Sequence, residues 1–116
     1  QSCALIGLAC AVLQDRGEVT PWSLNLLFNA AGSGPLGRPQ DQHPLLFENV
    51  IDAPTVFVLG EEDVWYPHGV EQSKLYLDPL VLVHNAGHEF PKYDARGDEI
   101  YEEIANRMLA LSSRLP

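Results

Sequence analysis

Two runs of residues, TVFVLG at 55–60 and LVLVH at 80–84, are apolar except for Thr55 and His84 at their ends, without alternation of polar and apolar side chains. A strand that exposes one face to water alternates, so a continuous apolar run predicts a strand covered on both faces. Pro54 precedes the first run and Gly60 ends it, as expected at the boundaries of a strand. Strands of this kind belong to parallel sheets with helices on both sides, so the sequence predicts an α/β fold.

The rest of the chain supplies helices and one more strand. Helical spacing of apolar residues predicts a first helix that ends at Arg16-Gly17. Residues 23–34 predict another buried strand, and the proline-rich residues 34–44 predict a loop. A short helix or turn is expected over 69–76, and a last helix over 98–111. The residues predicted to form the apolar faces of the two long helices are Leu5, Leu8, Ala9, Val12, Leu13, Ile100, Ile104, Met108 and Leu111.

Length and charge narrow the classes of function. A chain of 116 residues is one domain at most. Its net charge of −9 argues against a nucleic-acid-binding protein, which needs a basic surface. No apolar run is long enough to cross a bilayer. Cys3 and Cys10 lie about 10 Å apart along one helix, too far for a disulfide, which indicates a reducing, cytoplasmic location. We expect neither a cofactor nor a metal ion.

A carboxylate and an imidazole follow the two best-defined strands. Asp63 comes four residues after Leu59, and His88 comes four residues after His84. Because the carboxyl ends of parallel strands meet at one edge of a sheet, we expect Asp63 and His88 to lie close together. An Asp that accepts a hydrogen bond from one imidazole nitrogen fixes the tautomer and leaves the other nitrogen as a base.

Other residues compete for these roles. Glu61 and Glu62 are alternatives to Asp63, although they lie nearer the strand. His84 sits inside the strand end and is interpreted as structural, while His43 and His68 lie in loops without a pattern. A single Asp in an acidic run, or a single His, is more often a structural or surface group than a catalytic one. The placement of Asp63 and His88 after two neighbouring buried strands is what favours a catalytic role for both.

Two segments, GEEDVWYPHGVEQSKLYL at 60–77 and PLVLVHNAGHEFPK at 79–92, resemble the C-terminal half of the fungal FSH-type serine hydrolases. The resemblance implies the C-terminal part of an α/β-hydrolase fold, with about three parallel strands, flanking helices and a sheet that is incomplete on its own. It also implies that Asp63 is the acid and His88 the base of a catalytic triad. Ala86 departs from the pattern, since the family commonly has glycine there. The matching positions are Gly60, Asp63, Pro67, Ser73, His84, Gly87, His88 and Pro91.

The first nine residues, QSCALIGLA, are similar to the segment that begins at the Gln of the family's nucleophile elbow, Gly-x-Ser-Gln-Gly. The resemblance implies that the backbone N–H of Gln1 contributes to the oxyanion hole and that the nucleophilic Ser lies directly before Gln1. Ser2 stands where the family has Gly. Residues 1–116 would then form a partial α/β-hydrolase domain. Ser2 and Cys3 are alternative nucleophiles, but no strand precedes them as the elbow requires.

Two functions from different classes remain. The first is the C-terminal portion of a serine hydrolase that acts on an acyl ester or a carrier-bound thioester, as family members do in fungal polyketide pathways. The second is a non-catalytic, hydrolase-derived subunit that lacks the nucleophile and binds a ligand or another protein. Trp65 and Phe90 are candidates for lining an acyl pocket, or are simply edges of the core. The expected partner is the missing N-terminal half or a second subunit that completes the sheet.

Overall fold

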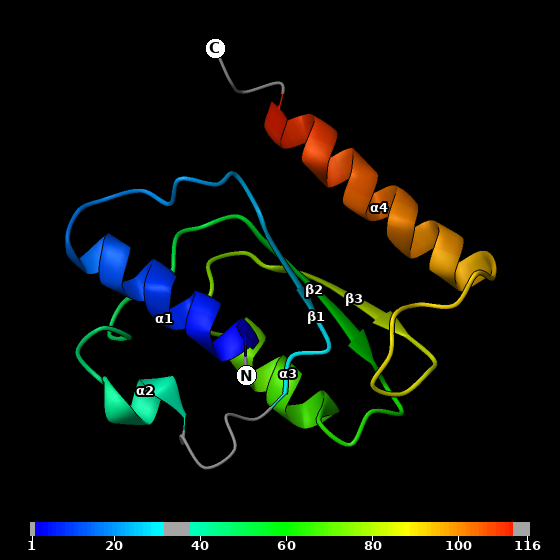
Figure 1. Cartoon of the computed structure of the whole chain (residues 1–116), viewed down its shortest axis with the longest axis horizontal. Helices are drawn as coiled ribbons and strands as arrows, with labels where there is room; N and C mark the ends of the chain where they lie inside the picture. Colours follow the sequence, from blue (N-terminus) through cyan, green and yellow to red (C-terminus); the bar gives the residue numbers. More distant parts are fainter. Residues whose placement is uncertain (1, 32–37, 113–116) are drawn as a thin grey trace.

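The computed structural model describes residues 2–31 and 38–112, and in these ranges helices and strands alternate (Figure 1). The helices and strands are α1 (Ser2–Asp15), β1 (Asn25–Phe28), α2 (Pro39–Gln42), β2 (Thr55–Gly60), α3 (Tyr66–Ser73), β3 (Leu80–His84) and α4 (Ala95–Ser112).

The three strands form one parallel sheet in the order β1-β2-β3. Central β2 is buried along its whole length, as its continuous apolar sequence predicts. The same prediction is wrong for β3, where Val81 is 37% exposed because this strand pairs on one side only in the described sheet. Leu27 and Phe57 point toward α1, whereas Val58 packs with Ile100 and Ile104 of α4 on the opposite face. Helices therefore cover both faces of the sheet (Figure 1). The predicted α/β fold with about three parallel strands is confirmed.

Helix α1 ends where the sequence predicts, but it buries a different face. Gly17 has a φ of 72°, and Glu18 N donates to Leu13 O at 2.8 Å, which closes the last turn. Leu5 is 59% exposed. The buried residues of α1 are Cys3, Gly7, Cys10 and Ala11. Small side chains allow the helix to lie close to the sheet, and this packing overrides the pattern of larger apolar residues.

Two short helices differ from their predicted positions, and in both a proline accounts for where the helix begins. Helix α2 lies within residues predicted to be a loop, and α3 begins at Tyr66 rather than at residue 69. In each helix a proline occupies the first turn, where the missing N–H needs no partner and the fixed φ suits the helix. Tyr76, predicted to end the short helix, instead pairs with Ile51 in an isolated parallel bridge.

The last helix begins earlier than predicted because Asp94 caps it. Asp94 Oδ1 accepts from Gly97 N at 2.8 Å, which satisfies a free N–H of the first turn. Ile100 and Ile104 are buried as predicted, whereas Met108 is 55% exposed, so the predicted apolar face meets the sheet only through its first half. In residues 2–31 and 38–112, no helix is long and apolar enough to span a membrane.

Candidate active site

The loops after β2 and β3 are joined by main-chain hydrogen bonds. Glu61 N donates to His84 O at 2.9 Å, and Glu62 N donates to Ala86 O at 3.1 Å. These bonds extend the pairing of the two strands into their loops. The loop that carries Asp63 and the loop that carries His88 therefore form one frame at the carboxyl edge of the sheet.

Gly60, the last residue of β2, lets the two loops approach this closely. A Cβ placed on Gly60 would lie 2.9 Å from His84 Cε1, and the carbonyl oxygens of Ala86 and Gly87 would be nearer still. Cβ atoms essentially never approach other heavy atoms within 3.0 Å, so only glycine fits here without moving the loop. Gly87 is different, because a Cβ there would meet nothing within 4 Å.

The structure brings Asp63 and His88 together. His88 Nδ1 lies 2.7 Å from Asp63 Oδ2. A carboxylate oxygen can only accept, so Nδ1 carries the hydrogen, and Nε2 of a neutral ring carries the lone pair. The side chain of Asp63 is 2% exposed and that of His88 is 52% exposed. Nε2 makes no hydrogen bond within the described ranges, so an accessible base is held by a buried carboxylate.

Local bonds orient the Asp63 carboxylate. Its second oxygen, Oδ1, accepts from Trp65 N at 2.9 Å, so each oxygen has its own donor. The backbone carbonyl of Asp63 accepts from Tyr66 N at 2.9 Å, which ties the residue to the start of α3. Glu61 and Glu62, the alternatives to Asp63, are exposed. Of the acidic groups in this run, only Asp63 has the geometry of an imidazole partner.

The first turn of α1 lies at the same edge of the sheet. Helix α1 runs antiparallel to the strands, so its N-terminus lies where they end (Figure 1). Cys3 Sγ donates to Phe28 O at 3.7 Å, and the ring of Phe28 lies 4.8 Å from that of Phe90, two residues after His88. A chain of contacts thus links the start of α1 to the His88 loop.

The two alternative nucleophiles differ in accessibility. Cys3 is buried, and burial raises the pKa of its thiol above the ordinary value, which disfavours the reactive thiolate. Ser2 is exposed at the first position of α1. Gln1, the predicted oxyanion residue, lies outside the described residues.

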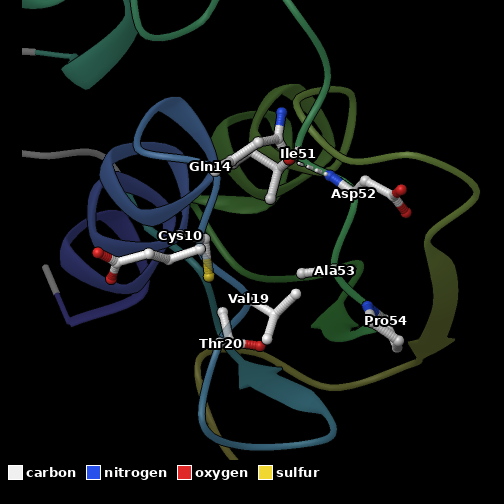
Figure 2. Close-up of a pocket in the computed structure, with 10 residues that line it drawn as sticks. Cys10, Gln14, Val19, Thr20, Ile51, Asp52, Ala53 and Pro54 are labelled. Atoms are coloured by element: carbon white, nitrogen blue, oxygen red, sulfur yellow. Dashed lines mark hydrogen bonds between the residues drawn. The ribbon is translucent and has the colours of Figure 1, made fainter.

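The predicted pocket residues stand at the rim of the site. Trp65 is 39% exposed and contacts His68 edge to face, and Phe90 is 64% exposed beside Phe28. A cavity of about 510 Å³ lies elsewhere, at the opposite end of the sheet, next to Pro54 and Thr20 (Figure 2). Gln14 closes one of its walls by accepting from Asp52 N and donating to Val50 O, both at 2.8 Å. This cavity is remote from Asp63 and His88.

His84 is buried, in agreement with its interpretation as structural, but its bonding is specific. Ala86 N donates to His84 Nδ1 at 3.2 Å. His84 Nε2 is also buried and has no partner within the described part of the chain. The sequence signalled the position of His84 without revealing this bond, which depends on the fold of the loop. Among the described residues, no cluster of potential ligands could hold a metal ion.

Comparison with known proteins supports the fold. No family model matches the sequence, and no curated protein matches it. The structure is similar to an esterase of Pyrobaculum calidifontis, with a TM-score of 0.60 and 18% sequence identity. The match covers 94% of this chain and 50% of the esterase chain, so the chain spans about half the length of that protein. At this level of identity the likeness shows the fold alone, a parallel sheet with flanking helices.

Proposed function

We propose that this chain is the C-terminal part of a serine hydrolase of the FSH type, with Asp63 as the acid and His88 as the base of its triad. The observation that carries the proposal is the 2.7 Å contact between His88 Nδ1 and Asp63 Oδ2, with the carboxylate buried and the imidazole half exposed. The residues that resemble the family pattern and the esterase fold add support.

The geometry suits acyl transfer. His88 Nε2 would accept the proton of an attacking serine hydroxyl and later return it to the leaving group. Asp63 would hold the ring in the required tautomer and stabilise the imidazolium that forms. The serine would be supplied by the residue that precedes Gln1, and the contacts from Cys3 through Phe28 to Phe90 favour its arrival beside His88. The backbone N–H of Gln1 would then bind the developing oxyanion.

The proposed substrate is an acyl ester or a carrier-bound thioester. Apolar side chains border the Asp63–His88 pair, as an acyl group would require: Val64 is 80% exposed, and Trp65 and Phe90 are also exposed. The net charge of −9 would slow encounter with an acidic carrier protein, so a small ester fits the chain equally well.

The proposed partner is the segment or subunit that would extend the sheet beside β1. In the described ranges β1 pairs only with β2, and its residue Leu26 is 36% exposed. A further strand there would satisfy the free main-chain groups and cover this apolar edge.

The test is labelling with a fluorophosphonate probe, which reacts with an activated serine. The 116-residue chain should not be labelled. The chain joined to its upstream segment should be labelled at a serine directly before Gln1, and His88→Ala should lower its ester turnover by several orders of magnitude. His68→Ala, which changes an exposed histidine of the same rim, should have little effect. Labelling of the short chain at Ser2 would move the elbow into this sequence. Failure of the extended protein to label would contradict the proposal and favour the non-catalytic subunit.

A further inference from the structure

His84 and His88, four residues apart, hold opposite tautomers. His88 Nδ1 faces the Asp63 carboxylate and must donate, whereas His84 Nδ1 faces the Ala86 N–H and must accept. The hydrogen of a neutral His84 ring is therefore on Nε2. The short loop between the two histidines carries both arrangements, and each depends on the path of the backbone between them.

The bond to His84 fixes the central peptide groups of this loop. Ala86 N is held by the His84 ring, and Ala86 O accepts from Glu62 N at 3.1 Å. Gly60 leaves room for the carbonyls of Ala86 and Gly87 against the end of β2. With its N–H and C=O both bonded, Ala86 sets the direction in which the chain continues to His88.

Packing alone does not account for an imidazole at this place. His84 is 4% exposed, and its Nε2–H has no acceptor within the described ranges. A buried donor without a partner destabilises a protein, and an apolar side chain of similar size would fill the space without that cost. The favourable feature of His84 is thus its Nδ1 acceptor, which no apolar residue provides.

We propose that His84 is a positioning residue for His88: its Nδ1 holds the Ala86 N–H and so fixes the loop that places the His88 imidazole on Asp63. This inference rests on the proposed function, since the placement of His88 matters for catalysis only if His88 is the base. His84 does not touch the substrate; it acts through the backbone of residues 85–88.

The test compares the wild-type protein with His84→Asn and His84→Leu. Asn offers an acceptor oxygen close to the position of Nδ1, and Leu offers none. Long-range proton–nitrogen NMR of labelled protein should show His84 with hydrogen on Nε2 and His88 with hydrogen on Nδ1. In His84→Leu, the His88 ring should no longer be found only as the tautomer with hydrogen on Nδ1. Hydrogen exchange of the Ala86 amide should accelerate by on the order of tenfold relative to the Val58 amide of β2, which serves as the internal reference for global stability. His84→Asn should restore both readouts.

Several results would overturn the proposal. One is a wild-type His84 with hydrogen on Nδ1, a measurement that needs no variant and stands even if His84→Leu fails to fold. Another is equal acceleration of Ala86 and Val58, which would mean a general loss of stability. A third is failure of His84→Asn to restore the His88 tautomer. None of these readouts requires activity, so a failed probe-labelling test would reject the proposed function and leave the role of His84 to be judged separately.

Discussion

Replacement of Gly60 by alanine should disrupt the site, although Gly60 has no side chain and takes no part in the proposed chemistry. The new Cβ would lie 2.9 Å from His84 Cε1 and closer to the carbonyls of Ala86 and Gly87. Carbonyl groups of the backbone cannot rotate away as a side chain can, so the loop must move. That movement would break the bonds from Glu62 N to Ala86 O and from Ala86 N to His84 Nδ1.

The size of the effect follows from these contacts. Overpacking of a tight site costs about 1–3 kcal/mol, and each lost hydrogen bond costs about 1 kcal/mol net. Alanine stabilises the chain slightly by restricting the unfolded state, by about 0.4–1 kcal/mol. The expected net loss is about 2–4 kcal/mol, which lowers the midpoint of thermal unfolding by at least about 8 °C in a domain of this size.

Gly87→Ala is the matched control for this change. It makes the same chemical substitution in the loop after β3 that Gly60 contacts, but its Cβ would meet nothing within 4 Å, and Gly87 has no positive φ. Urea and thermal unfolding should show Gly87→Ala within about 1 kcal/mol of wild type. NMR should show the Nδ1–H tautomer of His88 retained in Gly87→Ala and lost in Gly60→Ala. Equal stability of the two variants would refute the argument that the two carbonyls crowd Gly60.

Three further predictions concern packing, pH and assembly. Ile104→Ala should lower the free energy of unfolding by about 2–5 kcal/mol because Ile104 is buried in one apolar cluster with Val58 and Leu82. Met108→Ala on the same helix should change it little, and equal losses in urea titrations would contradict the packing of α4. Burial raises the pKa of Tyr76 above 10.0, so the unfolded chain loses this proton at lower pH than the folded protein, and stability should fall as pH rises above about 10. Tyr76→Phe should reduce that alkaline loss, and an unchanged pH profile would argue against burial of the hydroxyl. The chain alone should sediment as an assembly heavier than a monomer, and Leu26→Lys at the β1 edge should shift it toward monomer; a stable wild-type monomer would count against the proposed sheet partner.

The sequence predicted the structure best where burial of apolar side chains was the dominant effect. The strand at 55–60 was predictable because burial along its whole length leaves little room for polar residues. The strand at 80–84 was also located correctly, but its apolar run does not mean burial on both faces, since Val81 is 37% exposed. The nearness of Asp63 and His88 followed from the positions of these two strands, since parallel strands end at one edge. The direction of each side chain could not be deduced, because it depends on bonds such as Trp65 N to Asp63 Oδ1.

The features that the sequence left undetermined depended on packing between distant residues or on local contacts that other residues obscured. The buried face of α1 consists of small residues, among them Cys3 and Gly7, because the helix lies close to the sheet, a distance that no local pattern encodes. The start of α4 depended on the Asp94 cap, a local signal that the acidic residues at 98–103 obscured. The bond from Ala86 N to His84 was hidden because it requires the loop to turn back on its own strand.

The main-chain bonds between the two loops have a consequence for how such a site changes over evolutionary time. Glu61 and Glu62 contribute N–H groups, and Ala86 contributes a C=O, groups that nearly every amino acid possesses. Substitutions at these positions would leave the frame intact, so selection would act chiefly on Gly60, Asp63, His84 and His88, while the residues that contribute only main-chain groups would be free to diverge. Related sites would then share a three-dimensional arrangement long after their sequences have ceased to align. Such sites could be found by searching known structures for a glycine packed against two loop carbonyls and a buried Asp that contacts an exposed His. Sequence comparison alone would miss them.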